Sequence, residues 1–395
     1  MLTSARALRL CIAILTFNAI ATTAMAQTIK IGMISTYSGP EAAFGEKMDR
    51  GMKLYTKLNA HQLPPGVKVE VITRDDGGPN PDKAKQIAQE LIVRDKVHFL
   101  TGVVWTPNAM AMAPLTAEAK VPFIIMNAGA SVITTRSPYI ARVSFTMYQA
   151  SVPLGEWAAR KYKRAYTAVS DFSPGHDSDD AFERGFKKGG GEVIGKLRMP
   201  VMNADFVPFL QRMKDARPDV IYYFVPAGRQ ATAFVKAYAD LALAKEGIAL
   251  VASTDITTDE ELPEASLGMM SAYHYSASGD RPANRAFVAA FKKEYGENLN
   301  PEFVAVAAWD AMDMIYRAIR EQKGKLDPDR TMALMKTYKN PDSPRGPIHI
   351  DPETRDIVHN EYLREIRRVG GKLVNFEIET IGVGVKDLWK EMNKK

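Results

Sequence analysis

The sequence predicts an α/β protein made of two similar lobes, each with a largely parallel sheet covered by helices. Three observations lead to this fold class. Apolar, strand-like runs alternate with amphipathic, helix-like stretches along most of the chain. Several of these runs carry no charge and no clear alternation of polar and apolar residues, which is typical of strands covered by helices on both faces. The alternation also runs twice, once up to about residue 144 and again over about 166–252.

The expected strands are short, apolar and bounded by turn-forming residues. The first set falls at 28–35, 67–73, 97–104 and 121–126, and the second set at 166–170, 220–225 and 248–252. Near the C-terminus, two further runs at 360–369 and 372–381 flank Gly370 and Gly371. This last arrangement is typical of a β-hairpin.

Helices are expected between these strands because apolar residues recur three or four positions apart. In the first helix the stripe contains Phe44, Met48 and Met52. Asn80 and Pro81 open the second helix as a cap and a first-turn proline. Further helices are expected at 148–163, 177–189, 205–216, 230–242, 284–295 and 304–321.

The first 26 residues are predicted to be a signal peptide that is cleaved after Ala26. Arg6 and Arg9 form a short basic start, an apolar stretch follows, and residues 24–26 have the small-x-small form of a cleavage site. Cys11 is the sole cysteine, so the processed protein is expected to have no disulfide and no thiolate metal site. The net charge of +6 falls to +4 without the two arginines, and no basic stripe supports nucleic-acid binding.

Motifs for the common enzymatic chemistries are missing. The stretch "SGPEAAFG" at 38–45 follows a strand, but Gly39 and Gly45 are one residue too far apart for a phosphate-binding loop, and the Lys-Ser/Thr pair is absent. No nucleophile elbow is present, and the six histidines lack metal-binding spacing. Asp75 and Asp76 could hold a metal, although a turn before Asn80 also explains them. We therefore expect a protein that is not an enzyme and binds no cofactor and no metal.

Small and hydroxylated residues gather in the loops that follow the third, fourth and fifth strands. These loops read "TGVVWTPNAMAMAPLTAEAK", "IIMNAGASVITT" and "DFSPGHDSDDAF". In open parallel sheets, ligands bind at the carboxyl ends of the strands. Small residues expose backbone amides there, and helix N-termini favour anions such as carboxylates. The pattern indicates a binding site for a small anion.

Blocks along the whole chain resemble one known family. The block "IKIGMISTYSGPEAAFGEKMDRGMKLYTKLNA" resembles the opening of the periplasmic solute-binding proteins of branched-chain amino acid ABC transporters, the leucine-binding protein family. The resemblance continues through "TGVVWTPNAMAMAPLTAEAKVPFIIMNAGAS", "DFVPFLQRMKDARPDVIYYFVPAG" and "GPIHID". It implies the type I periplasmic binding fold, with two Rossmann-like lobes joined by a three-segment hinge and a ligand in the cleft between them. The implied lobes are 27–144 with 276–350, and 145–275 with 351–395.

The resemblance also implies roles for residues of the first lobe. Thr106 matches the position whose hydroxyl meets the ligand carboxylate. Phe44 matches the aromatic residue that packs on the apolar part of the ligand. The loop after the fourth strand is implied to supply backbone groups and a second hydroxyl, and its residues here are Asn127, Ala128, Gly129, Ala130 and Ser131.

In the second lobe, the implied contacts depart from those of amino-acid binders. His176 lies where relatives use an aromatic or polar side chain, and Asp255 matches the acidic residue that meets the ligand ammonium. A second acidic residue is absent, because Met147 stands at its place beside Tyr148. Trp105 flanks Thr106 where relatives often have a small residue. These departures favour a larger, more apolar carboxylate, with an aromatic acid among the candidates.

Simpler structural roles also fit several of these residues. Trp105 fits a packing residue, His176 fits a helix cap, and Phe44 fits the core stripe of its helix. Ser131 fits the N-cap of a short helix.

Taken together, the sequence predicts the solute-binding component of an ABC importer. It is expected to be a periplasmic monomer that captures an amino acid or related carboxylate and delivers it to an inner-membrane permease. A sensory module of the same fold, which would report the ligand to a regulator, is the alternative function. An enzyme is the third, and it would turn over the bound ligand.

Overall fold

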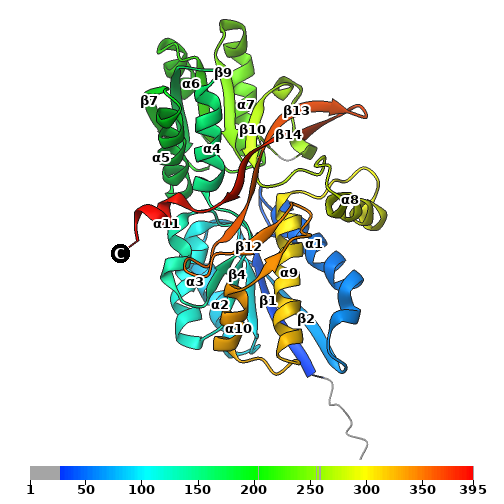
Figure 1. Cartoon of the computed structure of the whole chain (residues 1–395). Coiled ribbons are helices and arrows are strands. Elements are labelled where there is room, and N and C mark those ends of the chain that lie inside the picture. Colours follow the sequence, from blue (N-terminus) through cyan, green and yellow to red (C-terminus); the bar gives the residue numbers. More distant parts are fainter. Residues whose placement is uncertain (1–26, 203, 255, 258, 395) are drawn as a thin grey trace, which may run out of the picture.

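The computed structural model describes residues 27–394 except 203, 255 and 258. The predicted signal peptide (1–26) and Asp255 therefore lie outside the described residues. The described chain forms two α/β lobes, one above the other in Figure 1, and each lobe has its own parallel sheet core. This confirms the predicted fold class.

The lower lobe is built on a parallel sheet with the strand order β2-β1-β3-β4-β5. Its strands are β1 (Gln27–Ser35), β2 (Val67–Asp75), β3 (Phe99–Gly102), β4 (Phe123–Ile125) and β5 (Ile140–Arg142). The helices that cover it are α1 (Ala43–Asn59), α2 (Pro81–Val93), α3 (Thr106–Ala119), α9 (Phe303–Glu321) and α10 (Pro328–Lys336).

The two faces of this sheet bury different helices because side chains alternate along a strand. Ile31 and Met33 belong to the same hydrophobic core as residues of α1 and α9. Leu100 and Phe123 belong to a second core with residues of α2 and α3. Both faces are therefore covered, which explains the uncharged strands in the sequence.

The upper lobe is built on a mixed sheet. Its parallel part has the order β10-β9-β8-β6-β7, and β13 adds to β10 as an antiparallel strand. The strands are β6 (Arg164–Ser170), β7 (Glu192–Met199), β8 (Val220–Phe224), β9 (Ala249–Ser253), β10 (Met270–Tyr273) and β13 (Ile357–Val369). The helices are α4 (Met147–Ala159), α5 (Ser173–Lys188), α6 (Val207–Asp215) and α7 (Arg229–Asp240).

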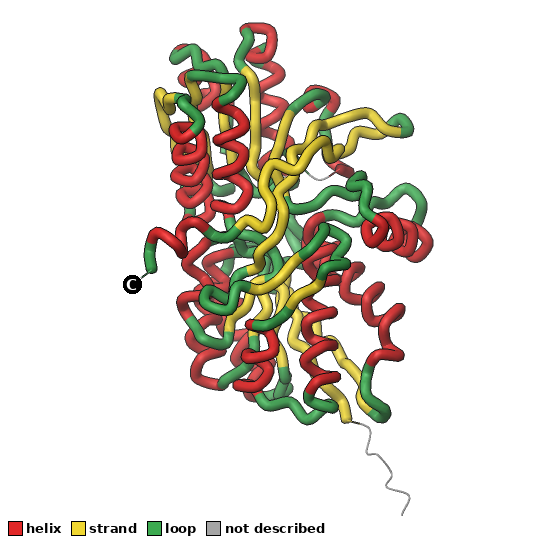
Figure 2. Tube along the Cα trace, in the orientation of Figure 1, coloured by secondary structure: helices red, strands yellow, loops and turns green. Residues whose placement is uncertain are grey.

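The remaining elements connect the lobes or flank them. Strand β13 runs from the lower into the upper lobe and pairs with β14 (Lys372–Val385) as the predicted hairpin, in which Gly370 and Gly371 have φ angles of 56° and 82°. The others are α8 (Pro282–Tyr295), β11 (Lys339–Asn340), β12 (Ile348–Ile350) and α11 (Leu388–Met392). The chain passes between the lobes after β5, after β10 and along β13 (Figures 1 and 2). The exact residue bounds proposed for the lobes remain a prediction.

Buried ion pairs hold the crossing segments together. The Nε atom of Arg142, at the end of β5, lies 2.9 Å from Oδ1 of Asp356, just before β13. Arg345 lies 2.7 Å from Asp310 of α9 and donates to the carbonyl of Val143. These side chains are almost fully buried, so each charge depends on its partner and on backbone acceptors.

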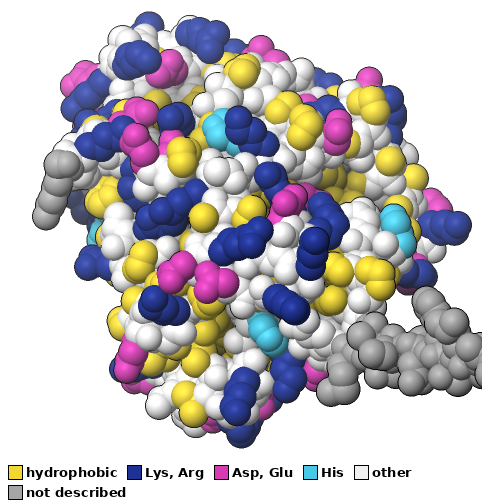
Figure 3. Space-filling model, turned by 60° about the horizontal axis from the view of Figure 1, so that its bottom comes forward, with side chains coloured by type: hydrophobic (Ala, Val, Ile, Leu, Met, Phe, Trp, Pro, Cys, Tyr) yellow, Lys and Arg dark blue, Asp and Glu magenta, His cyan; other side chains and the backbone are white. Residues whose placement is uncertain are grey.

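Basic and acidic side chains are interspersed over the face shown in Figure 3. None of the helices in the described part of the chain combines the length and apolar character that a membrane crossing requires.

Candidate functional site

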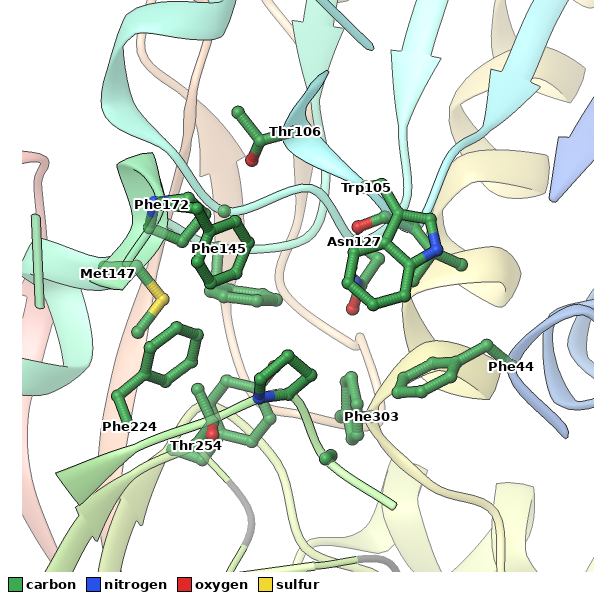
Figure 4. Close-up of a pocket in the computed structure, with 16 residues that line it drawn as sticks. Phe44, Trp105, Thr106, Asn127, Phe145, Met147, Phe172, Phe224, Thr254 and Phe303 are labelled. Carbon is green, nitrogen blue, oxygen red and sulfur yellow. Dashed lines mark hydrogen bonds between the residues drawn. The ribbon is translucent and has the colours of Figure 1, made fainter. Parts of the chain in front are cut away.

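A cavity of about 60 Å³ lies between the two lobes, and Figure 4 shows the residues around it. On the same measure one water molecule needs roughly 10–15 Å³, so the cavity can take a small molecule. Its wall combines side chains of both lobes. The lining residues are Phe44, Val104, Trp105, Thr106, Asn127, Gly129, Phe145, Met147, Phe172, Pro174, Phe224, Pro226, Ala227, Thr254, Tyr273 and Phe303.

Aromatic rings make up much of this wall. Phe172 and Phe224 of the upper lobe are stacked, with ring centroids 6.1 Å apart and an interplanar angle of 15°. Phe303 lies 5.0 Å from Tyr273 and 6.0 Å from Phe44 by the same centroid measure. Such rings favour flat, apolar ligands through edge-to-face and offset contacts.

The indole of Trp105 has its polar atom occupied. Its Nε1 donates to Oγ1 of Thr36 over 3.1 Å, and that hydroxyl donates to Oδ1 of Asp76 over 2.8 Å. Asn108 donates to the other oxygen of Asp76 over 2.9 Å. The network satisfies the indole N–H on the protein side, so what Trp105 adds to the cavity wall is its apolar ring surface (Figure 4).

Two polar side chains of the lower lobe have unsatisfied oxygens at the cavity. Thr106 is the first residue of α3, and its Oγ1 is buried without a hydrogen-bond partner among the described residues. Asn127 donates from Nδ2 to the carbonyl of Val104 over 2.9 Å, and its buried Oδ1 has no described partner. Because both residues also line the cavity, these two oxygens are available for hydrogen bonds to a molecule inside it.

The electrostatics of the cavity favour an anion held by neutral groups. None of the described lining side chains is charged. Thr106 stands at the N-terminus of α3, where backbone N–H groups are unpaired and the helix dipole is positive. A carboxylate at this point gains hydrogen bonds without a buried counter-charge.

Local backbone geometry explains how the loops reach the cavity. Gly102 ends β3 with a φ of 100°, and a Cβ atom there would lie 2.3 Å from the Ile34 carbonyl oxygen, so only glycine fits. A Cβ on Gly129 would lie 2.7 Å from the ring of Phe145. The glycine therefore lets this ring pack closely against the loop.

The structure brings five of the eleven sequence-predicted site residues to the cavity. These are Phe44, Trp105, Thr106, Asn127 and Gly129. For Phe44 and Trp105 both interpretations apply, because each is buried in the core and also lines the cavity. Asp255 lies outside the described residues.

Ala128, Ala130 and Ser131 do not line the cavity. The two alanines belong to the core with residues of α2 and α3. Ser131 begins a 3₁₀ turn (Ser131–Arg136), and its backbone N–H donates to Asp177 while its hydroxyl donates to Asp387. Its hydrogen bonds are thus satisfied by the protein, and it links the lower lobe to α5 and the C-terminal segment.

Tyr148 and His176 are also directed away from the cavity. Helix α4 begins at Met147, so Met147 lines the cavity and Tyr148, one position further around the helix, bonds to Asp180 over 2.5 Å. Helix α5 begins at residue 173, four residues earlier than predicted, so His176 lies in its first turn. There it is half-exposed and its Nε2 lies 2.7 Å from Asp171.

The sequence analysis did not predict most of the upper-lobe residues that line the cavity. Phe172 and Phe224 lie at the carboxyl ends of β6 and β8, which is the signal that could have indicated them. Phe303 opens α9, far along the chain, and only the folded structure brings it to the cavity.

Asp75 and Asp76 form the predicted turn. Asp75 accepts from the backbone of Tyr37 and Gly77, and Asp76 accepts from the backbone of Gly78. Burial raises the pKa of Asp76, although these hydrogen bonds oppose the shift. Within the described ranges, no three His, Cys, Asp or Glu side chains are arranged to hold a metal.

Comparison with known proteins gives a consistent result. The family model described as "Periplasmic binding protein" matches residues 28–372. A protein of Brucella melitensis named Leu/Ile/Val-binding protein homolog 6 is 39% identical over 373 residues, which covers 93% of this chain and 95% of the relative.

Solved structures of similar proteins contain aromatic acids. An ABC transporter solute-binding protein of Rhodopseudomonas palustris BisB5, in complex with 3,4-dihydroxybenzoic acid, is 45% identical with a TM-score of 0.86 and coverage of 92% of this chain and 99% of that one. A second from R. palustris, with 4-hydroxybenzoate, is 43% identical with a TM-score of 0.87 and coverage of 91% and 98%. A third, with benzoate, is 29% identical with a TM-score of 0.82 and the same coverage.

Proposed function

The chain belongs to the periplasmic binding protein family, and on that premise we propose that it captures an aromatic carboxylate for an ABC importer. The solute lies in the cavity between the lobes, and the closed protein delivers it to an inner-membrane permease. In this proposal the chain works as a periplasmic monomer after its signal peptide is cleaved after Ala26. No bond of the solute is made or broken.

The observation that carries the proposal is the composition of the cavity wall. Aromatic rings from both lobes face a space without charged side chains among the described lining residues. An amino acid brings an ammonium group that needs a buried acidic partner, because an unpaired buried charge is costly. A benzoate-like acid has only its carboxylate to satisfy, and the rest of the molecule is flat and apolar.

The carboxylate is proposed to lie at the N-terminus of α3. Thr106 supplies its otherwise unpartnered hydroxyl, and the helix supplies backbone N–H groups. A hydroxyl donating to a charged acceptor contributes about 1.5–3 kcal/mol. The ring of the ligand then packs between the rings of the two lobes.

Asn127 is proposed to meet a ring hydroxyl. Its Nδ2 donates to the Val104 carbonyl, and the reversed amide would place two oxygens against each other. The remaining oxygen is a buried acceptor without a described partner, and it suits a hydroxyl donor rather than a carboxylate. A hydroxybenzoate satisfies both Thr106 and Asn127.

The second candidate solute is a branched-chain amino acid. It is favoured by the name of the 39%-identical relative from Brucella melitensis, a Leu/Ile/Val-binding protein homolog. A thermal-shift screen over benzoate, the hydroxybenzoates, leucine, valine and aliphatic acids separates the two, because a tight ligand raises the melting temperature by mass action. Shifts with leucine and valine alone would reject the aromatic proposal.

The same samples test for catalysis. Mass spectrometry of the ligand recovered from the incubated protein is expected to find it unchanged. A product formed in amounts beyond one equivalent would show that the chain is an enzyme.

A further inference from the structure

The rim of the cavity carries a set of charged groups that the capture mechanism above does not use. We propose that Glu260 is a positioning residue for capture. It completes a group of ion pairs across the rim, called the latch below, which favours the closed state. The latch also makes closure dependent on ionic strength. The latch consists of Lys47, Asp259, Glu260 and Glu302. The proposal rests on the proposed function only in that a solute is captured by closure of the lobes.

The latch connects the two lobes through direct contacts. Lys47 of α1 lies 2.8 Å from Oε2 of Glu302, which precedes α9 in the same lobe. The same ammonium lies 3.2 Å from Oε2 of Glu260, in the 3₁₀ turn Asp259–Glu261 of the upper lobe. The backbone N–H of Asp259 donates to Oε1 of Glu302 over 3.1 Å, so Glu302 also contacts the upper lobe.

Asp259 is held in place from both sides of the cleft. Its Oδ1 accepts from the backbone and side-chain amides of Asn375 in β14, over 3.0 and 2.9 Å. Its Oδ2 accepts from Asn300 of the lower lobe over 3.2 Å. The turn that carries Glu260 therefore has a defined position on the upper lobe and a defined contact with the lower one.

The charged side chains of the latch differ in how deeply they are buried. The side chains of Lys47 and Glu302 are 8% and 6% exposed, whereas that of Glu260 is 44% exposed. The first two lie in the same lobe and stay paired when the lobes separate. Burial alone lowers the pKa of Lys47, but the two carboxylates outweigh it and raise the pKa above its usual value. The ammonium is thus charged and available to Glu260 on closure.

The latch is continuous with the ligand-binding wall. Phe44 lies three residues before Lys47 on α1, and Phe303 follows Glu302 directly; both rings line the cavity. A smaller cavity of about 30 Å³ at this rim is lined by Phe44, Lys47, Glu302 and Glu260, together with Ala227 and Gly228 of the upper lobe. Closing the latch therefore brings the upper lobe against the aromatic wall.

Two consequences follow for closure. A ligand stabilises the closed state through its contacts with both lobes, and the latch adds an attraction that exists only in that state. Because Glu260 is half-exposed, salt screens its attraction to Lys47. We therefore expect the closed state to become less stable as ionic strength rises, although the described side chains that line the cavity are uncharged.

The test compares Glu260→Gln with Glu294→Gln. Glu294 of α8 pairs with Lys57 of α1 over 2.6 Å, so the control loses the same charge and an ion pair to the same helix, but within one lobe. We expect Glu260→Gln to raise the Kd for 4-hydroxybenzoate about two- to five-fold at low salt and to flatten its salt dependence. Glu294→Gln is expected to change neither. Equal behaviour of the two variants would overturn the proposal.

A second measurement follows closure directly, without a ligand and without any change to the four latch residues. Glu118 and Lys236 are exposed and lie in different lobes, and the chain after residue 26 has no cysteine, so Glu118→Cys and Lys236→Cys allow a pair of fluorophores to be attached. Energy transfer in the unliganded protein is expected to fall as salt rises from about 20 to about 500 mM. A constant signal would refute the latch. Absence of any 4-hydroxybenzoate binding would instead count against the proposed function.

Discussion

Replacing Thr106 with valine tests the carboxylate position with little disturbance of the fold. Valine keeps the shape of threonine, and the lost hydroxyl has no hydrogen-bond partner among the described residues. The unliganded protein is therefore expected to keep its stability within about 0.5 kcal/mol. If the ligand carboxylate accepts from this hydroxyl, the variant loses about 1.5–3 kcal/mol of binding, which is roughly a 10- to 150-fold rise in Kd.

The assay is isothermal titration calorimetry with 4-hydroxybenzoate and with its neutral aldehyde analogue. The loss is expected to be smaller for the aldehyde, at about 0.5–1.5 kcal/mol, because its acceptor is uncharged. Thr116→Val is the matched control, since Thr116 lies in the same helix and bonds to Ala113 and Ser137 away from the cavity. An unchanged Kd for Thr106→Val would remove Thr106 from the site.

Three further predictions address the wall and the C-terminal segment. Phe224→Ala removes the ring stacked on Phe172 and is expected to weaken 4-hydroxybenzoate binding at least about ten-fold in calorimetry, whereas a ligand held only by the lower lobe would show no change. Gly129→Ala is expected to displace the Phe145 ring and cost about 1–3 kcal/mol of binding; retained affinity would show that the loop has room. Burial, with the nearby Asp356 carboxylate, raises the pKa of Asp387 to about 7, so the folded state binds this proton more tightly than the unfolded state. The stabilisation from protonation is complete below the unfolded pKa of about 4 and is lost as pH rises toward 7. Between pH 4 and pH 8, the free energy of unfolding of Asp387→Asn in urea is therefore expected to rise by on the order of 1–4 kcal/mol relative to that of the native chain. A difference between the two chains that does not change with pH would contradict the raised pKa of Asp387.

The fold was predictable where strands are buried on both faces. Most such strands read as short uncharged runs. The seven strands predicted within 27–252 all correspond to strands of the structure, including the partly exposed and charged β2. Strand β7 was not predicted because Gly195 and the charged Lys196 and Arg198 interrupt its short apolar run. Strand β5 has three residues and ends in Arg142, whereas the equally short β4 lies within a longer apolar run, 121–126. The antiparallel pairing of β13 with β10 joins segments about ninety residues apart, and no local pattern encodes it.

The site was predictable only within one lobe. Thr106 and Asn127 follow strands of the first sheet, so their place at its carboxyl edge follows from topology. Phe303 reaches the cavity through the packing of α9, which depends on tertiary structure. His176 and Tyr148 were predicted to be in the site but do not line the cavity. A shift of a few residues in the start of a helix changes the direction of a side chain.

The cavity is proposed to accept an aromatic carboxylate in preference to an amino acid. Calorimetric titration of one preparation with 4-hydroxybenzoate and with L-leucine tests this claim most directly. We predict a Kd of about 1 μM or tighter for 4-hydroxybenzoate and binding at least about 100-fold weaker for leucine. Tight leucine binding with no heat from the aromatic acid would contradict the account.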